Sequence, residues 1–503
     1  MTSKGFSYLL LWMVIVVYRR LFTDKLSAQI IQDTNLPNGL INNPRSIQAT
    51  SDNGFIISGN NSLGLTGYFS TEIIKLDSTL NVDWIVDQPP RLLLNPTYSV
   101  VCSDGGILIN DTKDILNSNS QSTYSQGKIL KYKPNGILDW EYTFNQPYWN
   151  WTGAMTEING DFYILWQRFL EHHYNSNAQS EWHVLKFSSN GDSIGSINIT
   201  DLSPPGMFFK VYKDLITTSD GQLLLSGWGQ TWLPSLLSNP INQAVSVPLL
   251  QKIDLTGDLI WDYSELPEHK EVPYQAQFWN VEELPCGDFV AFGVKKNNFF
   301  NGYVIRLDAN GQHLNSIIHN QNWNEFMAGT SYQNCGFIAV GYLRLNISPI
   351  ARGSLIAANN EFNQEVINTS ITNYPQETEE VVYDICPLKN DPNKFAMVMR
   401  NLNASRVVII GDFQNELTVP ETPEQGDIAI FPNPSDGIFQ VSSLSTEPIQ
   451  ISILDQQAKQ VAQFDLDELS SDHSFDLSDQ APGVYFAHIM QGEQQWVKKL
   501  VLR

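Results

Sequence analysis

Six segments of the chain share one pattern, in which a short polar turn containing glycine is followed at once by an apolar run. They are SDNGFIISG at Ser51, SDGGILIN at Ser103, INGDFYILW at Ile158, SDGQLLLSG at Ser219, PCGDFVAFG at Pro285 and QNCGFIAVG at Gln333. Apolar runs that do not alternate with polar residues are typical of strands buried on both faces. The pattern therefore predicts a series of buried β-strands that each begin at a tight turn.

A second pattern follows each of these strands and contains another turn. It reads IIKLDSTLNVDW at Ile73, ILKYKPNGILDW at Ile129, VLKFSSNGDSIG at Val184, LQKIDLTGDLIW at Leu250 and VIRLDANGQHLN at Val304, with a weaker sixth copy at Leu355. A seventh repeat is fainter, with KFAMVMR at Lys394 and VVIIGDFQNELTV at Val407. Asn-Gly and Asp-Gly between apolar runs predict hairpins, because type I′ turns need positive φ at both central residues. Each repeat therefore predicts two hairpins, or four strands, in about 50–60 residues.

A four-stranded repeat of this size is typical of one blade of a β-propeller. The repeats run from Arg45 to Asn415 and predict an all-β, seven-bladed ring that closes near Phe413. Six or eight blades are the alternatives, because the first and last repeats are the least regular. Trp84, Trp140 and Trp261 recur at one place after the second turn, and we expect them to pack between blades.

The connections between the predicted strands differ in length. In a four-stranded blade both short hairpin turns lie on one side of the disc, and the remaining connections lie on the other. Four long, irregular segments belong to this second class: Phe144–Gly153, Asn110–Gly127, Trp166–Glu181 and Gly227–Pro248. Long loops on one face of a rigid scaffold often carry binding sites.

Aromatic residues gather in or near these long segments, among many Asn, Gln and Ser residues. The candidate ligand-binding residues are Tyr148, Trp149, Trp151, Trp166, Trp228 and Trp232. Exposed aromatic rings with amide neighbours suit sugar rings or protein surfaces. The alternative is that these rings only seal the loops onto the propeller.

The C-terminal part of the chain has a different pattern. A Pro- and Glu-rich linker is expected over residues 418–426, which ends a predicted propeller domain over 29–417. Seven short segments follow: IAIFPNP, GIFQVSS, IQISILD, KQVAQFDL, HSFDLS, GVYFAHIM and QWVKKLVLR. Seven short, alternating strands over residues 427–503 predict a small, Ig-like β-sandwich.

This C-terminal segment resembles the type A C-terminal sorting domain of the Bacteroidetes type IX secretion system. The residues that carry the resemblance are Pro432, Asn433, Pro434, Gly437, Gly483, Tyr485, Lys498 and Lys499. A glycine usually stands near Gln457, so the DQQAK segment departs from the family. The resemblance implies that the type IX secretion machinery is a partner and exports the protein to the cell surface. The cargo is then anchored there or released. The alternative is an Ig-like adhesion module.

The repeats resemble the PQQ-like or delta-60-like propeller repeats of Bacteroidetes surface proteins. The shared phrase, a lysine in an apolar run followed by Asp, Gly and Trp, occurs in propellers with many functions. Quinone enzymes of similar fold use a dedicated set of calcium and cofactor ligands. This sequence shows no such set, so we expect no cofactor.

A secretory signal peptide is predicted over residues 1–28. Lys4 precedes an apolar run from Tyr8 to Val17 that is too short to span a bilayer as a helix, and Ala28 suits a cleavage site. The charges in YRRLFTDK fit a signal peptide poorly. A signal anchor or a misassigned start codon therefore stays an alternative, and we expect no transmembrane segment in the mature chain.

The charge argues against one class of partner, and the cysteine spacing argues against one kind of metal site. The formal net charge of −23 repels phosphate backbones and anionic lipid, so nucleic acid is not an expected partner. Cys102, Cys286, Cys335 and Cys386 show no CxxC spacing, which argues against a zinc site. Cys286 and Cys335 hold similar places in successive repeats, whose equivalent positions we expect to be too far apart to bond. The sequence thus predicts mostly free, buried thiols.

Candidate catalytic groups are few. The chain has no HExxH, EF-hand or P-loop motif, and Glu171, His172 and His173 lack a partner histidine at metal-site spacing. Loop carboxylates such as Asp114, Glu181 and Glu325 are candidates for a general acid and base only if the fold pairs them. The sequence favours a secreted or surface propeller that binds a glycan or a surface protein. The alternative is an extracellular polysaccharide hydrolase or lyase on the same face.

Overall fold

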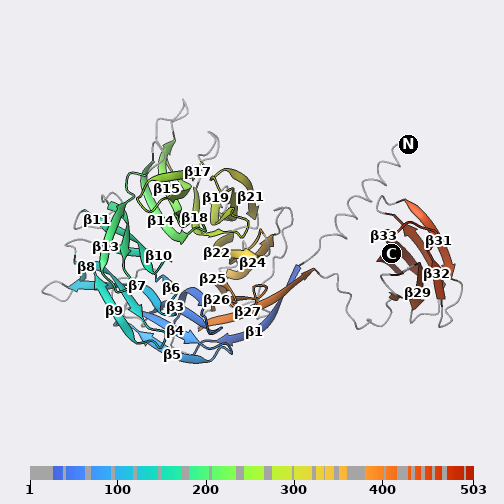
Figure 1. Cartoon of the computed structure of the whole chain (residues 1–503), viewed down its shortest axis with the longest axis horizontal. Coiled ribbons are helices and arrows are strands. Elements are labelled where there is room, and N and C mark those ends of the chain that lie inside the picture. Colours follow the sequence, from blue (N-terminus) through green and yellow to red (C-terminus); the bar gives the residue numbers. More distant parts are fainter. Residues whose placement is uncertain are drawn as a thin grey trace. The chain divides into compact units, whose positions relative to one another are not determined.

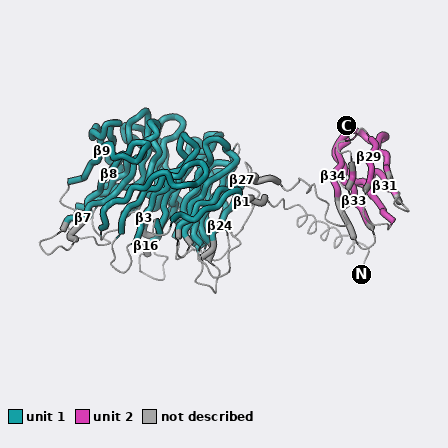
Figure 2. The backbone as a smooth tube through the Cα atoms, turned by 90° about the horizontal axis from the view of Figure 1, so that it is seen from below, with its two compact units in different colours: residues 1–416 teal, residues 417–503 magenta. Residues whose placement is uncertain are grey.

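The computed structural model describes residues 26–502 and forms two compact units, Met1–Glu416 and Leu417–Arg503 (Figure 2). The residues that it leaves undescribed are 1–25, 38–40, 63–68, 92–96, 117–121, 146–149, 171–179, 203–206, 234–242, 266–274, 297–299, 320–323, 333–334, 345–350, 359–379, 402–403, 416–428, 432–434, 436, 443–447, 456–458, 467–472, 492–493 and 503. All regular elements among the described residues are β-strands.

The strands of the first unit form antiparallel groups in chain order around a common axis (Figure 1). One sheet is β2 (Asn43–Ala49), β3 (Phe55–Ser62), β4 (Phe69–Leu76) and β5 (Val82–Asp87). The next is β6 (Ser99–Val101), β7 (Ile107–Leu116), β8 (Ser122–Tyr132) and β9 (Leu138–Thr143). It is followed by β10 (Asn150–Ile158), β11 (Asp161–Phe169), β12 (Ser180–Phe187) and β13 (Ser193–Asn198).

Two further groups of four strands are joined into one sheet by a single parallel pair, Ser246 with Gln275. The first group is β14 (Met207–Thr217), β15 (Leu223–Leu233), β16 (Gln243–Ile253) and β17 (Leu259–Ser264). The second is β18 (Gln275–Glu283), β19 (Phe289–Lys296), β20 (Phe300–Leu307) and β21 (His313–His319). A sheet of β22 (Asn324–Tyr332), β23 (Gly336–Arg344) and β24 (Ala351–Ala358) comes next. The fold is a β-propeller, as the repeats predict.

The last sheet of the propeller combines both ends of the first unit. It contains β25 (Glu380–Pro387), β26 (Phe395–Asn401) and β27 (Ala404–Asn415), with β1 (Leu26–Asn35) paired antiparallel to β27 at its outer edge. An ion pair between Asp33 and Arg406 fastens the two strands. The repeat pattern predicts closure near Phe413 but gives no sign of β1, because β1 lies outside the repeats.

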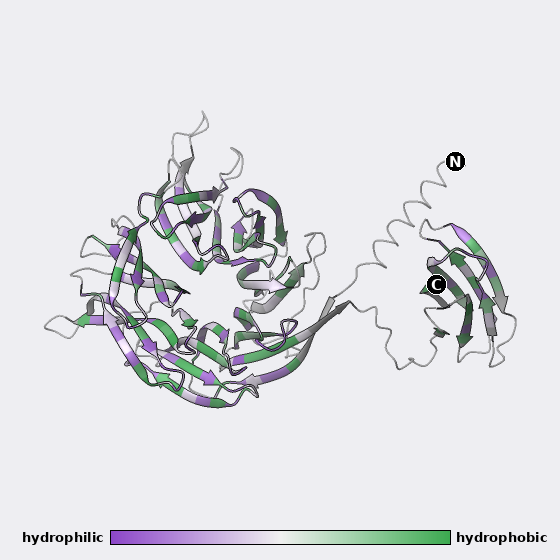
Figure 3. Cartoon of the chain, in the orientation of Figure 1, coloured by the Kyte–Doolittle hydropathy of each residue, from purple (hydrophilic) through white to green (hydrophobic). Residues whose placement is uncertain are grey.

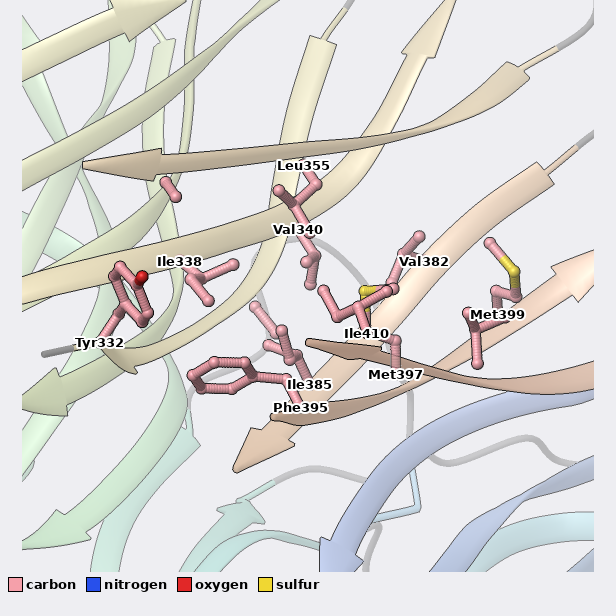
Figure 4. Packing of buried hydrophobic residues seen from close by; sticks show 13 residues of the cluster. Tyr332, Ile338, Val340, Leu355, Val382, Ile385, Phe395, Met397, Met399 and Ile410 are labelled. Atoms are coloured by element: carbon pink, nitrogen blue, oxygen red, sulfur yellow. The ribbon is translucent and has the colours of Figure 1, made fainter. Parts of the chain in front are cut away.

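The middle strands of the sheets are buried on both faces, as their unbroken apolar runs predict. Nearly every residue of β3 and β4 is buried, whereas β5 at the outer edge alternates between half-buried and exposed residues. Figure 3 shows hydrophobic stretches along the strands of the ring, interrupted by hydrophilic residues. Figure 4 shows how neighbouring sheets share a core, with Ile338 and Val340 of β23 packed near Phe395 and Met397 of β26.

The lysine that recurs in the third strand of the repeats forms the same ion pair in three sheets. Its ammonium group reaches back to the aspartate of the first turn, 2.9 Å in Lys75–Asp52 and 2.7 Å in Lys131–Asp104. Lys252–Asp220 repeats the contact at 2.8 Å. The aliphatic stem of each lysine is therefore buried, and the charge of its ammonium group is neutralised at the end of its own sheet.

The first hairpins form where the sequence predicts them, but most use another turn. Only Asn159 and Gly160 have positive φ at two successive turn residues among the described hairpins. In SDGG a single residue, Gly105, has positive φ, and its N–H donates to the Cys102 carbonyl at 2.9 Å. This is a three-residue loop with a glycine bulge, the next most common hairpin connection.

The three repeated tryptophans pack between sheets, which confirms the prediction. The Trp84 indole N–H donates to the Pro134 carbonyl at 3.1 Å, and the Trp140 indole N–H donates to the Ser189 carbonyl at 3.0 Å. Trp261 makes the same contact with Ala309 at 3.2 Å. Each ring covers a turn glycine of the next sheet, so a Cβ added at Gly191 would lie 2.6 Å from Trp140.

Much of two of the predicted long loops, Asn110–Gly127 and Gly227–Pro248, is strand. The β7–β8 hairpin continues to Leu116 and resumes at Ser122, and β15 continues to Leu233 before β16 resumes at Gln243. Asn, Ser and Thr residues in these segments pair across the hairpins, although their composition resembles that of loops. The irregular connections are therefore shorter than the sequence predicts.

The prediction of free thiols is wrong for one pair. Cys286, in the turn after β18, and Cys335, in the turn after β22, form a disulfide with Cα atoms 5.6 Å apart. The first strands of neighbouring sheets converge toward the propeller axis, so equivalent turns there come within bonding range. Cys102 and Cys386 are free, and Cys102 is buried as predicted.

The second unit consists of two antiparallel sheets. One sheet is β28 (Ala429–Phe431), β29 (Ile438–Ser442) and β32 (His473–Asp476). The other is β30 (Ile449–Leu454), β31 (Gln460–Leu466), β33 (Gly483–Gln491) and β34 (Gln494–Leu502). Residues of both sheets, including Phe439, Phe475, Ile451 and Ile489, share one hydrophobic cluster. All seven segments that the sequence marks as strands are strands.

Candidate functional site at the propeller axis

The first strand of most sheets carries a β-bulge near its middle. The extra residue is Arg45 in β2, Lys213 in β14, Trp279 in β18, Met327 in β22 and Tyr383 in β25. All five side chains are half-buried. Since a bulge redirects a side chain out of the regular pleat, the bulges give five different side chains the same place in their sheets.

Cationic and aromatic bulge residues from neighbouring first strands contact one another. The Arg45 guanidinium lies 5.3 Å from the centre of the Tyr383 ring, and the Lys213 ammonium lies 5.4 Å from the Trp279 ring. Both distances suit cation–π attraction, so each aromatic ring holds the neighbouring cation in place.

The residue after the bulge connects adjacent sheets. The Asp214 carboxylate accepts a 3.0 Å hydrogen bond from the Val281 N–H. The Asn280 amide oxygen accepts one of 3.0 Å from the Gly329 N–H. The Asp384 carboxylate accepts one of 2.9 Å from the Ile47 N–H. These bonds fix the spacing of the first strands, and with it the places of the bulge residues.

The charges of sheets that are not adjacent in the ring act on one another. Burial raises the pKa of Glu282 to about 8, and the carboxylates of Asp214 and Asp384 add to the rise. Burial also raises the pKa of Asp384 to about 7, against its hydrogen bonds from Ile47 and Ile385. Burial lowers the pKa of Lys213, and the charge of Arg45 lowers it further. Groups on β2, β14, β18 and β25 therefore converge at the axis.

Tyr98 joins this convergence from the residue before β6. Burial raises the pKa of Tyr98 to about 12, with Asp214 adding to the rise and Arg45 opposing it. We call the converging set the axial cluster. Its members are Arg45, Tyr98, Lys213, Asp214, Trp279, Glu282, Tyr383 and Asp384.

Several donors of the axial cluster are unused. Within the described part of the chain, the Arg45 Nε and Trp279 Nε1 atoms are buried without a hydrogen-bond partner. Neither Arg45 nor Lys213 forms an ion pair with a described residue. In contrast, the Asp214 carboxylate accepts bonds from Leu215, Val281 and Asn280. The cluster is thus rich in free donors, while two of its carboxylates are committed to the fold.

The aromatic residues predicted to bind a ligand do not form one group in the structure. Trp166 is only 6% exposed and stacks on Phe144 in the core, with ring centres 5.3 Å apart. Trp151 is half-buried against Phe169, and Trp228 is half-buried against Phe209. Tyr148 and Trp149 lie outside the described residues, as does the side chain of Trp232, whose backbone pairs with Ala244 in the β15–β16 ladder.

The candidate catalytic carboxylates lie on strands and not on loops. Asp114 belongs to β7, Glu181 to β12 and Glu325 to β22. Glu181 forms an ion pair with Arg168 on the neighbouring strand. Its hydrogen bonds from Arg168 and His183 lower its pKa, although burial alone would raise it. Glu181 therefore suits a structural ion pair better than a general acid. Glu171, His172 and His173 lie outside the described residues.

In the second unit, the residues around the PNPSDG turn attach to the last strand of the chain. The Ser435 N–H donates to the Val501 carbonyl at 2.9 Å, and Ser435 forms a parallel bridge with Leu502. Gly437 has a φ of 137°, and a Cβ there would lie 2.8 Å from the Ser478 side chain. Only glycine fits this place. Pro432, Asn433 and Pro434 lie outside the described residues.

The other predicted sorting residues lie on the last two strands. The Tyr485 hydroxyl donates to the Ala481 carbonyl at 2.6 Å, just before Gly483 begins β33. Lys498 and Lys499 belong to β34 and pair with Ala487 and Phe486. Residues 429–503 match the family model described as the secretion system C-terminal sorting domain. The second unit is a sorting domain. The chain is therefore a type IX secretion cargo, exported to the cell surface or the extracellular space.

Solved structures similar to this chain share low identity with it. A protein of unknown function from Dyadobacter fermentans is 11% identical, with 76% of this chain and 99% of that chain covered and a TM-score of 0.39. The β-propeller domain of the trilobed protease from Pyrococcus furiosus is 6% identical, with 75% and 95% covered and a TM-score of 0.41. The α-L-arabinofuranosidase Arb93A from Fusarium graminearum is 10% identical, with 63% and 92% covered and a TM-score of 0.38.

These likenesses concern the fold alone. No curated protein matches the chain. Among the described residues, no helix is long and apolar enough to cross a membrane, and no group of three or more His, Cys, Asp or Glu residues could hold a metal ion.

Sequence reasoning missed the axial cluster, although a weak signal for it exists. A bulky residue followed by Ser, Asp or Asn stands at Arg45–Ser46, Lys213–Asp214 and Trp279–Asn280. In each case the second residue lies seven positions before the turn residue of positive φ, which is Asn53, Gly221 or Gly287. Aligning the repeats on that turn residue would have placed these side chains together.

Proposed function

We propose that this chain is a secreted or surface-anchored propeller that binds a glycan or a surface protein, with the ligand held at the axial cluster. The observation that carries the proposal is the pair of cation–aromatic contacts, Arg45 with Tyr383 and Lys213 with Trp279. Half-buried aromatic and charged side chains with unused donors are typical of a ligand site, since a purely structural cluster would satisfy its own donors.

The long-connection face adds to this proposal. Tyr148, Trp149, Trp151, Trp228 and Trp232 stay candidates for contacts with the outer part of a ligand, because each lies in or beside a connection of that class. Trp166 is buried and is better placed to support the core.

A hydrolase or lyase is the second candidate. Glu282 and Asp384 both have raised pKa values, and the charge of Asp384 contributes to the rise at Glu282. A general acid of a glycosidase needs a carboxyl group that stays protonated near neutral pH. Asp384 suits this role poorly, because its carboxylate oxygens already accept hydrogen bonds from the backbone N–H groups of Ile47 and Ile385.

The two candidates separate in one paired experiment. The full-length protein is applied to a glycan array, and the same glycans are incubated with it and assayed for new reducing ends. Binding without turnover supports the binding proposal, turnover supports the hydrolase, and silence in both assays contradicts both.

We also propose the division of the chain into a signal peptide over 1–28, a seven-bladed propeller over 29–417, a linker over 418–426 and an Ig-like sorting domain over 427–503. The successive groups of strands around the axis support seven blades. Cleavage after Ala28 would leave most of β1 to pair with β27. Deleting residues 417–503 should leave a folded propeller that no longer reaches the cell surface. Normal surface amounts of the truncated protein would contradict a sorting role.

A further inference from the structure

We infer that Arg45 and Lys213, together with the indole N–H of Trp279, bind an oxyanion of the ligand, either a carboxylate or a sulfate group on a sugar. This inference rests on the proposed binding function and names the chemical group that the axial cluster recognises.

Two cations of the axial cluster lack an ion-pair partner among the described residues. Arg45 on β2 and Lys213 on β14 come from sheets that are not neighbours, and yet the charge of Arg45 acts on Lys213. Neither cation has an ion-pair partner among the described residues, in a chain with a formal net charge of −23. Holding two like charges together costs free energy, which a bound anion would recover.

Two hydrogen-bond donors of the axial cluster are also unused among the described residues. Arg45 Nε and Trp279 Nε1 are buried and have no partner within the described part of the chain. A buried donor without an acceptor costs about 1–3 kcal/mol, so native proteins rarely keep one without a ligand or water at the site. An oxyanion offers several acceptor lone pairs at once and can satisfy more than one of these donors.

The carboxylates of the cluster do not compete for the two cations. Asp214 accepts hydrogen bonds from Leu215, Val281 and Asn280, and Asp384 accepts them from Ile47 and Ile385. Glu282 is largely protonated at neutral pH, since its pKa is raised to about 8. A protonated Glu282 carries no negative charge that would pair with the two cations.

The aromatic rings hold the two cations in place. The Tyr383 and Trp279 rings lie 5.3 and 5.4 Å from the charges of Arg45 and Lys213. They limit the motion of two long side chains, so less conformational entropy is lost when an anion binds.

The test is isothermal titration calorimetry of the full-length protein with three sugars. Glucuronate carries a carboxylate, glucose 6-sulfate carries a sulfate, and glucose is the neutral reference. We expect one or both anions to bind and glucose to bind at least tenfold more weakly, because hydrogen bonds to charged groups contribute about 1.5–3 kcal/mol. Which anion binds identifies the source of the oxyanion.

Lys213→Gln and Arg45→Gln should each weaken anion binding about tenfold or more, with a melting temperature close to that of the wild type. Lys113→Gln, at an exposed lysine of β7, is the matched control and should bind as the wild type does. If both axial variants melt early, Trp279→Phe provides the same test through the loss of a single N–H.

Two results would overturn the inference. The first is equal affinity for glucose and the anionic sugars. The second is anion binding that the axial variants leave unchanged. Binding on the glycan array would still support a binding role in the first case, whereas the second case would also place the ligand away from the axial cluster. Silence on the array as well would contradict both.

Discussion

The Asp384 carboxylate accepts a 2.9 Å hydrogen bond from the Ile47 N–H, although the two residues are 337 positions apart in the chain. The bond joins the first strand of the last sheet to the first strand of the first sheet. At the outer edge, β1 pairs with β27 and so also joins the start of the first unit to its end. The ring is therefore fastened both near its axis and at its rim.

Replacement of Asp384 tests the inner fastening. Asp384→Ala should lower the free energy of unfolding by about 1–3 kcal/mol, because the Ile47 N–H loses its acceptor. Asp384→Asn keeps an oxygen in place and should cost less. Thermal melting of both variants gives the comparison, and equal losses in Asn and Ala would show that the bond to Ile47 does not stabilise the ring.

Two glycines form a matched pair for the contact between sheets. Gly191 and Gly160 have φ values of 87° and 86°, but only Gly191 lies under a tryptophan ring, while an added Cβ at Gly160 meets nothing within 4 Å. Both alanine variants bear the backbone cost of about 1–2 kcal/mol. Gly191→Ala should cost more, because it also displaces Trp140. Equal melting temperatures would mean that the Trp–glycine contact contributes little.

The repeat pattern gave the strands, the hairpins and the packing of Trp84, Trp140 and Trp261, because those features depend on local sequence. Three features could not be predicted from the repeat pattern, for physical reasons. The β1 strand has no repeat partner and is defined only by pairing with a segment at the other end of the unit. The Cys286–Cys335 bond depends on how closely neighbouring sheets converge. The axial residues depend on bulges, which a strand pattern does not mark.

The disulfide between Cys286 and Cys335 should contribute strongly to stability. It closes a segment with a sequence separation of 49, for which loop-closure entropy predicts about 4 kcal/mol. Peptide mapping without reductant should recover these two cysteines linked, while Cys102 and Cys386 carry free thiols. The Cys286→Ser, Cys335→Ser double variant should melt well below the wild type. Four reactive thiols in the non-reduced protein would contradict the pairing.

The raised pKa of Glu282 predicts a particular pH dependence. Between pH 4.5, the ordinary pKa of this group, and about pH 8, the folded protein holds a proton that the unfolded chain has released. Stability from this group is therefore full below about pH 4.5 and falls as pH rises through about 8. The ionised form also faces the carboxylates of Asp214 and Asp384.

Glu282→Gln imitates the protonated side chain and isolates this effect from the general acidity of the chain. The variant and the wild type should melt at similar temperatures near pH 5. Near pH 9 the wild type should melt at a lower temperature than the variant. A gap in melting temperature that stays constant with pH would show that Glu282 titrates normally.

We propose that the propeller axis, and not only its loops, holds the ligand. The most direct measurement is the affinity of Trp279→Phe for the anionic sugar that the wild type binds best in the calorimetric series. This variant keeps an aromatic ring beside Lys213 and removes one buried N–H. Trp261→Phe, which loses a bond to the Ala309 carbonyl at the outer edge, is the control. The account predicts a loss of about fivefold or more for Trp279→Phe and none for Trp261→Phe. Equal affinity in wild type and both variants would place the ligand elsewhere.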